Sequence, residues 1–366
     1  MANNIPASSG AENCKQFSAC VKIVSIDSHE VNFKEGRGMK RQTPKRKLQY
    51  WILSLLGLFA AGFSAFILYT SWHEDRSVIS VVTNLADGST GKDGPYPDRP
   101  EYQLPDEIDT RYDYEKMTLN GMDNYVLENE RTAEKKIIYL HGGGYVSQPN
   151  PRHFRWLEGV QDQTDSTVML PVYPKAPQHQ YEEVFEKLVP LYTQTLENTE
   201  AENIVIMGDS AGGGLALALA QELRRQDIEQ PGDIIMLSPW LDVSMTNPDI
   251  QNLTSVDPFL DLEWLLNAGA SYAGDADLRN PMVSPIYGDM TGLGDMTLIV
   301  GTHELFLADA RKFSGITDEK NIPINYYEYP EMPHVFQLQD TDEGRRATQQ
   351  IVNIINDDAD DTSTTD

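Results

Sequence analysis

The sequence IVIMGDSAGGGLALALAQEL occupies residues 204–223 and joins two patterns. It begins as an apolar, β-rich run and ends rich in Ala and Leu, which favour a helix. Between them lies G-x-S-x-G, with glycines at 208 and 212 around Ser210. Glycines at these places allow a sharp strand-to-helix turn that exposes the serine hydroxyl at a helix N-terminus. The pattern therefore predicts a strand–turn–helix unit with Ser210 at its turn.

A second glycine-rich motif, HGGGY, occupies residues 141–145 and also follows an apolar strand-like run. Either motif alone could be an ordinary βα turn, in which Ser210 would only cap a helix. Together and in this order, they indicate ester hydrolysis with Ser210 as the nucleophile.

The same two motifs suggest where negative charge would be stabilised. A serine that attacks a carbonyl creates an oxyanion, which needs two or three preorganised N–H donors. We expect these donors to be the backbone amides of Gly142, Gly143 and Ala211. We expect His141 to shape the turn and not to act as a base.

The base is expected late in the chain, because triads of this kind run in the order serine, acid, histidine. Only His303 and His334 follow Ser210. His334 lies in the Pro-punctuated loop YPEMPHVF after the last strand-like run, so we assign it as the base. His303 is more typical of a packing residue.

The acid should follow the preceding strand, and the segment GTHELFLADARKF offers Glu304 and Asp309. Glu304 comes directly after the strand and is favoured, whereas Asp309 stands where a helix should begin and caps are common. Asp309 stays open as an alternative. We expect Asp209, beside the nucleophile, to fix the loop, since a triad acid must meet the histidine from its far side.

Strand-like and helix-like segments alternate through the rest of the chain. Strands are predicted over residues 136–140, 167–173, 203–207, 233–237, 296–300 and 324–329. Helices are predicted over residues 151–164, 181–197, 211–226, 262–270, 307–318 and 341–356. Such alternation is typical of a mainly parallel sheet covered by helices on both faces, with its site at the carboxyl ends of the strands.

From about residue 130 to 356, the chain resembles the hormone-sensitive-lipase-like family of α/β-hydrolases, bacterial esterases that carry HGGG and GDSAGG. The resemblance implies an α/β-hydrolase fold and a triad of Ser210, Glu304 and His334. It implies the same oxyanion donors as the motifs. Many members have aspartate in D-P-L-x-D, whereas this chain has E-L-F-L-A-D, and the departure keeps Asp309 open.

The resemblance also implies a small helical cap over the site, built here from about residues 77–125 and 243–280. The second segment contains an apolar set suited to hold an acyl chain or simply to pack on the domain. This set is Phe259, Leu260, Trp264, Leu265 and Leu266.

The N-terminal part predicts a membrane anchor. Residues 51–70, WILSLLGLFAAGFSAFILYT, carry no charge and would form a helix as long as a bilayer core is thick. Basic residues precede this segment, which predicts a cytoplasmic tail over residues 1–48 and a catalytic domain, residues 77–356, outside the cell. Cleavage and secretion is the alternative. Residues 1–38 could be a misassigned extension, and residues 357–366 are expected to be a disordered acidic tail.

The composition narrows the partners. The net charge of −27 repels phosphate backbones, so nucleic acid is excluded as a partner. Both cysteines precede residue 21, which leaves no cysteine nucleophile or Cys-rich metal site in the main domain. The oligomeric state is not predicted.

We therefore expect a serine carboxylesterase that hydrolyses short- to medium-chain acyl esters through an acyl-enzyme at Ser210, without a metal or cofactor. A non-catalytic ligand-binding protein on the same fold, and an amidase or acyltransferase with the same triad, are the alternatives.

Overall fold

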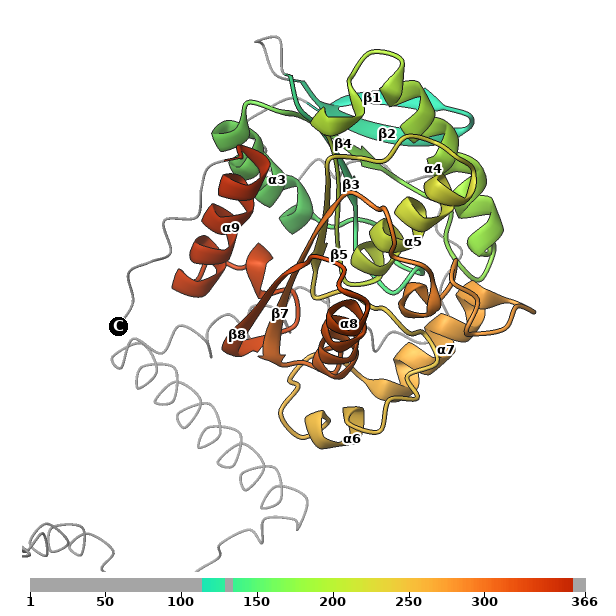
Figure 1. Cartoon of the computed structure of the whole chain (residues 1–366), viewed down its shortest axis with the longest axis vertical. Helices are drawn as coiled ribbons and strands as arrows, with labels where there is room; N and C mark the ends of the chain where they lie inside the picture. Colours follow the sequence, from blue (N-terminus) through green and yellow to red (C-terminus); the bar gives the residue numbers. More distant parts are fainter. Residues whose placement is uncertain (1–113, 129–133, 358–366) are drawn as a thin grey trace, which may run out of the picture. The chain divides into compact units, whose positions relative to one another are not determined.

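The computed structural model describes residues 114–128 and 134–357 (Figure 1). Eight strands form one sheet in the order β1-β2-β4-β3-β5-β6-β7-β8. The strands are β1 (Glu115–Leu119), β2 (Met122–Leu127), β3 (Lys136–Leu140), β4 (Thr167–Pro171), β5 (Ile204–Asp209), β6 (Asp233–Leu237), β7 (Asp295–His303) and β8 (Asn325–Pro333). β1 and β2 pair antiparallel with their neighbours, and all other pairs are parallel.

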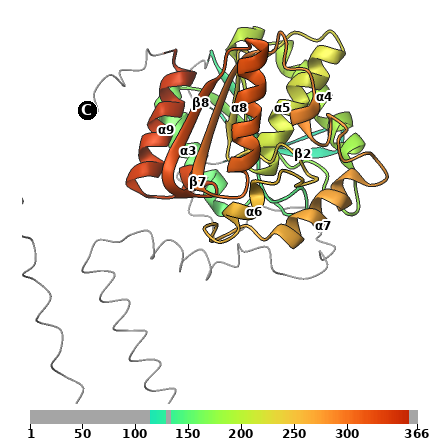
Figure 2. The same cartoon turned by 60° about the horizontal axis from the view of Figure 1, so that its bottom comes forward.

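Helices cover both faces of the sheet. They are α3 (Pro151–Thr164), α4 (Tyr181–Leu196), α5 (Ala211–Arg225), α6 (Ile250–Leu253), α7 (Leu262–Ala273), α8 (Leu307–Lys320) and α9 (Asp342–Ile355). The views in Figures 1 and 2 place α3 and α9 together on one face and α4, α5 and α8 on the other. The predicted α/β-hydrolase architecture, a mainly parallel sheet between helical layers, is therefore confirmed.

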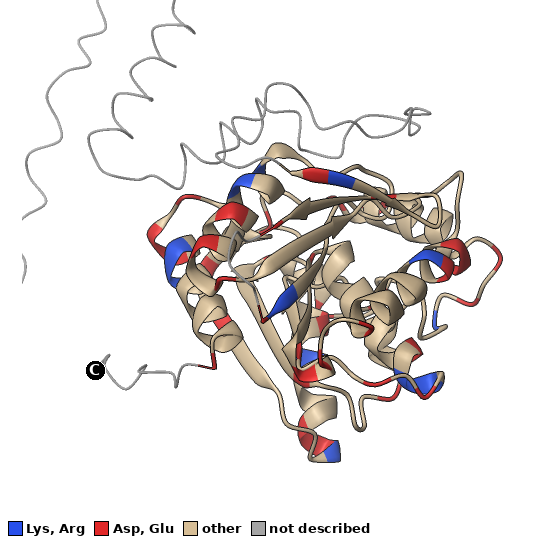
Figure 3. Ribbon diagram, turned by 90° about the horizontal axis from the view of Figure 1, so that it is seen from above, with Lys and Arg blue, Asp and Glu red and all other residues tan. Residues whose placement is uncertain are grey.

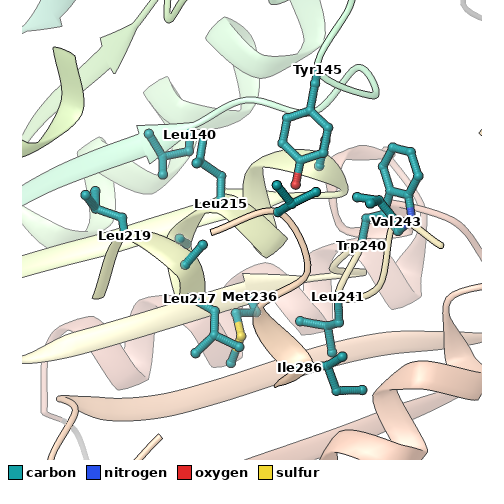
Figure 4. Close-up of a cluster of buried hydrophobic side chains, with 14 of the residues drawn as sticks. Leu140, Tyr145, Leu215, Leu217, Leu219, Met236, Trp240, Leu241, Val243 and Ile286 are labelled. Atoms are coloured by element: carbon teal, nitrogen blue, oxygen red, sulfur yellow. The ribbon is translucent and has the colours of Figure 1, made fainter. Parts of the chain in front are cut away.

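The strand sequences explain this sandwich. In β5 every residue is buried, and neighbouring side chains point to opposite faces. Ile204 and Ile206 belong to the apolar cluster under α5, whereas Val205 and Met207 belong to the cluster under α3 and α9. Figure 4 shows the first cluster, where three leucines of α5 face Leu140 of β3 and Met236 of β6. A continuous apolar strand thus specifies a sheet buried on both sides.

β1 and β2 were not expected. They show that residues 115–125, predicted to belong to the cap, form strands of the sheet instead. Residues 115–119 and 122–127 form a hairpin at the sheet edge, although the first predicted cap segment extended from 77 to 125. Asn120 and Gly121 both have positive φ, 51° and 74°, as an Asn-Gly hairpin turn requires. Residues 77–113 of that segment lie outside the described residues.

The predicted anchor, residues 51–70, the N-terminal tail and residues 358–366 also lie outside the described residues. Within the part that is described, no helix is long and apolar enough to cross a membrane. The longest described helix, α4, has 16 residues, fewer than the ~20 that a bilayer core needs. For the described residues, the predicted localisation as a single-pass protein of the cell membrane is corrected, since none of their helices is such a span.

Two glycines allow β5, α5 and the end of β3 to approach closely. A Cβ atom on Gly208 would lie 2.4 Å from the carbonyl oxygen of Gly212. A Cβ on Gly212 would lie 1.9 Å from the carbonyl oxygen of Leu140. These are backbone atoms, so a side chain at either position would push the turn away from β3.

We expect Gly212→Ala to lower the free energy of unfolding by about 3 kcal/mol or more, because the added methyl group overlaps backbone. Gly315→Ala in α8 is the matched control, since nothing lies within 4 Å of its Cβ position. There, alanine should stabilise the helix by up to about 1 kcal/mol. Denaturant unfolding measures both, and equal effects of the two substitutions would contradict the close packing.

Candidate active site

Ser210 lies at the sharp turn between β5 and α5, near the carboxyl edge of the sheet. Its φ of 56° and ψ of −123° are rarely adopted by residues with a side chain. The turn is held on both sides, because Ser210 N donates to Leu237 O and Ser210 O accepts from Trp240 N, at 2.8 and 2.9 Å. The serine side chain makes no capping hydrogen bond to the helix, so the hydroxyl is available for another partner.

That partner is His334, in the turn directly after β8. Its Nε2 lies 2.9 Å from Ser210 Oγ, and its Nδ1 lies 2.6 Å from Glu304 Oε2. Glu304 follows β7 and is completely buried. Three side chains from three distant parts of the sequence thus form one chain of hydrogen bonds. With Nδ1–H donated to the carboxylate, Nε2 is left to accept the proton of the serine hydroxyl.

The other carboxylate candidate, Asp309, lies elsewhere. It is buried near the start of α8, where its Oδ1 accepts from Asn247 Nδ2 at 3.0 Å. Burial raises the pKa of its carboxyl to about 6. His303 closes β7 and pairs in register with Pro333 of β8. The structure therefore brings Glu304, and not Asp309, to His334.

Ser238, a residue that the sequence analysis overlooked, holds Glu304 in place. Its hydroxyl donates to Glu304 Oε1 at 2.7 Å, and Gly301 N donates to the same oxygen at 2.8 Å. Ser238 Oγ also accepts from Val335 N, next to the histidine. Ser238 follows β6, so its position at a strand end was the available signal. Both oxygens of the Glu304 carboxylate are thus engaged.

The glycine loop differs from the expectation at one residue. Gly142 N donates to Asp209 Oδ1 at 2.8 Å, so this amide already has a partner and is not free to bind an oxyanion. The amides of Gly143, Gly144 and Ala211 form no hydrogen bond with the described residues. Gly143 and Gly144 have positive φ, 118° and 62°, which glycine adopts readily. Of the three expected donors, the structure thus leaves the amides of Gly143 and Ala211 without a partner but engages that of Gly142, and it adds the amide of Gly144, which was not expected.

Asp209 makes the loop-fixing contact that was expected of it. Besides Gly142 N, its Oδ1 accepts from Tyr139 OH at 2.7 Å and lies 3.2 Å from His153 Nε2. Burial opposes the charge of this carboxylate, but these contacts outweigh burial and lower its pKa. A charged, fully bonded aspartate under the glycine loop fixes the loop relative to β5.

His141 also lies under the loop and does not contact Ser210. Its Nδ1 lies 2.7 Å from Gly142 O, and its ring stacks on Tyr173 with 4.4 Å between centroids. Burial lowers its pKa well below the usual value, so the ring is neutral. This agrees with the structural role expected for it.

The second predicted cap segment lies between β6 and β7 and contains α6 and α7. Trp264, on the first turn of α7, packs on the glycine loop, because a Cβ on Gly144 would lie 2.4 Å from its ring. Leu265 is buried in the core, whereas Leu266 is 43% exposed. The residues of the apolar set therefore have different surroundings, and Trp264 is the one that contacts the glycine loop.

The surroundings of His334 favour its protonated form. Burial alone would lower its pKa, but the Glu304 carboxylate, helped by Asp257 and Asp209, outweighs burial and raises the pKa above its usual value near 6.5. Acidic side chains are spread over the loops and helices of the domain (Figure 3). Among the described residues, no group of three or more His, Cys, Asp or Glu side chains is placed to hold a metal ion.

This pKa predicts the pH dependence of turnover. A general base must be neutral, so kcat/KM should fall as the pH drops through the pKa of His334. Since that pKa is raised, the midpoint of the loss should lie above pH 6.5. Initial rates between pH 5 and 9 measure it, and a midpoint near 4 would point to a carboxylate as the titrating base instead.

The fold and the serine at a strand–helix elbow define an α/β-hydrolase, and comparisons with known proteins agree. The model of the alpha/beta hydrolase fold family matches residues 137–338. An esterase of Acinetobacter venetianus is 28% identical over 223 residues, 60% of this chain and 73% of that protein. An acetyl-hydrolase of Streptomyces hygroscopicus is 30% identical over 220 residues, 59% of this chain and 74% of that protein.

Solved structures give the same result. A hormone-sensitive lipase from a metagenome library superposes with a TM-score of 0.64 at 27% identity, covering 68% of this chain and 86% of that one. The family match includes both glycine motifs, Glu304 and His334 and spans more than half of the chain. The chain belongs to the alpha/beta hydrolase fold family. Its predicted likeness to hormone-sensitive-lipase-like esterases is confirmed.

Proposed function

We propose that this protein is a serine carboxylesterase in which Ser210, His334 and Glu304 are the catalytic triad. The observation that carries the proposal is the unbroken hydrogen-bonded chain from Ser210 Oγ through the imidazole to a buried carboxylate. Esterase relatives over most of the domain support the reaction class.

In the acylation step, Ser210 Oγ attacks the carbonyl carbon of the ester while its proton moves to His334 Nε2. The carbonyl electron pair moves onto oxygen, and we assign the amides of Gly143, Gly144 and Ala211 as the donors to this oxyanion. Glu304 stabilises the imidazolium that forms. When the carbonyl re-forms, the bond to the alcohol oxygen breaks, and that oxygen takes the proton from Nε2.

In the second step, a water molecule gives a proton to His334 Nε2 and attacks the acyl-enzyme. The tetrahedral intermediate collapses, Ser210 Oγ leaves with the proton from the imidazolium, and the acid is released. Ser210 and His334 thus take part in both steps, and each has regained its original protonation state after one turnover.

The substrate is proposed to be an ester with a short to medium acyl chain. The ring of Trp264 lies against Gly144, one of the proposed donors, and a ring of this size would limit the space for a bound acyl group. A long chain would have to displace this ring or pass around it.

The test uses the full chain with p-nitrophenyl esters from acetate to palmitate and Ser210→Ala as the control. We expect the highest kcat/KM on short to medium chains and a value roughly tenfold or more lower on palmitate. Faster cleavage of matched anilides would favour an amidase, and transfer to added alcohols above hydrolysis would favour an acyltransferase. No turnover on any substrate would favour a ligand-binding protein.

A further inference from the structure

Asp257 lies in the cap segment between α6 and α7, and its carboxylate joins the cap to the loop of the triad acid. Its Oδ1 accepts from Phe259 N and Leu260 N, at 2.8 and 2.9 Å, which closes a turn within the cap. Its Oδ2 accepts from Leu305 N at 2.7 Å, across 48 residues of sequence. One side chain therefore binds both sides of the boundary between cap and core.

The core side of this contact adjoins the triad. Leu305 follows Glu304, whose carboxylate is fixed by Ser238, Gly301 N and His334. An acceptor on Leu305 N fixes the peptide that carries Glu304, so the carboxylate is held through its backbone as well as its side chain. If the cap shifts, Asp257 leaves Leu305 N and this constraint is lost.

Asp257 also contributes charge. Three acidic side chains act electrostatically on His334, namely Glu304, Asp257 and Asp209, and each favours the imidazolium. Asp257 is partly buried, which raises the pKa of its own carboxyl, while its backbone donors and His334 act in the opposite direction. Asp257 thus acts on the imidazole in the same sense as Glu304, and it does so from the cap.

We propose that Asp257 is a positioning residue that couples the seating of the cap to the geometry and charge of the Glu304–His334 pair. The proposal rests on the proposed function, because it needs His334 to be the base. Through Asp257, the triad is fully competent only when the cap segment between α6 and α7 is docked against the core.

The test separates this role from that of an ordinary turn residue. Asp257→Asn keeps an amide oxygen for Phe259 N and Leu260 N, but its NH2 group would face Leu305 N and the negative charge is gone. Asp261→Asn is the matched control, because Asp261 caps α7 through Trp264 N and asparagine caps helices equally well. Both variants remove one cap carboxylate, and only Asp257 contacts the loop of the triad acid.

For Asp257→Asn in the full chain, we expect kcat on p-nitrophenyl butyrate to fall roughly tenfold with little change in KM. The acid limb of the kcat/KM profile should move down by about half a pH unit, because one charge that favours the imidazolium is lost. Asp261→Asn should keep the wild-type kcat and acid limb. Asp257→Ser, whose hydroxyl can still close the turn, serves if the asparagine variant does not fold.

An unchanged kcat and acid limb in Asp257→Asn would overturn the proposal, whether or not the melting temperature falls. Equal changes in Asp261→Asn would also overturn it, since they would reflect general loosening of the cap. Failure of the proposed function gives a different result, namely hydrolysis that survives Ser210→Ala.

Discussion

Replacement of Ser210 by alanine is expected to lower kcat by roughly 10⁵-fold and to leave the fold intact. The hydroxyl is the atom that forms the acyl-enzyme, and no neighbouring group can replace it in this step. The backbone bonds that hold the turn, Ser210 N to Leu237 O and Trp240 N to Ser210 O, do not involve the side chain. The substitution should therefore affect kcat without affecting the stability of the fold.

Steady-state kinetics on p-nitrophenyl butyrate and thermal unfolding measure these two quantities. Ser314→Ala, on α8, is the control and should keep the wild-type kcat and melting temperature. If Ser210→Ala retains more than a few per cent of the activity, Ser210 is not the nucleophile. If Ser210→Ala also lowers the melting temperature strongly, the loss of kcat alone does not show a role of the hydroxyl. In that case the assignment holds only if the variant still binds a substrate analogue.

Replacement of Glu304 by glutamine is expected to lower kcat by roughly 10³- to 10⁴-fold, whereas Asp309→Asn should change it less than about threefold. Glutamine removes the charge that stabilises the imidazolium and can present an NH2 group to His334 Nδ1, which disfavours the working tautomer. Asp309 contacts Asn247 and does not contact the histidine. The pair of substitutions thus distinguishes two acids that lie five residues apart.

Burial lowers the pKa of His334, and Glu304 is the first of the groups that raise it, so the acid limb should also shift to lower pH in Glu304→Gln. The same assays with both variants measure this shift. A larger loss of kcat in Asp309→Asn than in Glu304→Gln would show that Asp309, and not Glu304, is the triad acid. It would also mean that the 2.6 Å contact between His334 Nδ1 and Glu304 Oε2 is not the functional one.

Much of the fold could be predicted from local pattern. Six of the strands and six long helices could be predicted from β-rich runs that alternate with helix-forming segments, and the elbow from Gly208 and Gly212. The hairpin of β1 and β2 was missed, although Asn120-Gly121 is a strong turn signal. β1 is the edge strand and is largely exposed, and in β2 the polar residues Asp123 and Asn124 interrupt the apolar ones, so neither strand shows the continuous apolar run that marked the others.

The site was less predictable because its details depend on contacts between distant residues. Asp209 takes the amide of Gly142, which moves the free amides one residue along the loop, and no spacing rule contains that information. The choice between Glu304 and Asp309 depended on where β8 delivers His334. The contact from Asp257 to Leu305 depended on how the cap folds back over the core.

Labelling with a fluorophosphonate, followed by peptide mapping, tests the central claim most directly, because this reagent reacts with a serine only when the serine is activated. We expect one adduct per chain, on the peptide that contains Ser210. Labelling should be absent in Ser210→Ala and strongly slowed in His334→Ala. Absence of an adduct on wild-type protein, or an adduct on another residue, would contradict the assignment of Ser210 as the activated nucleophile.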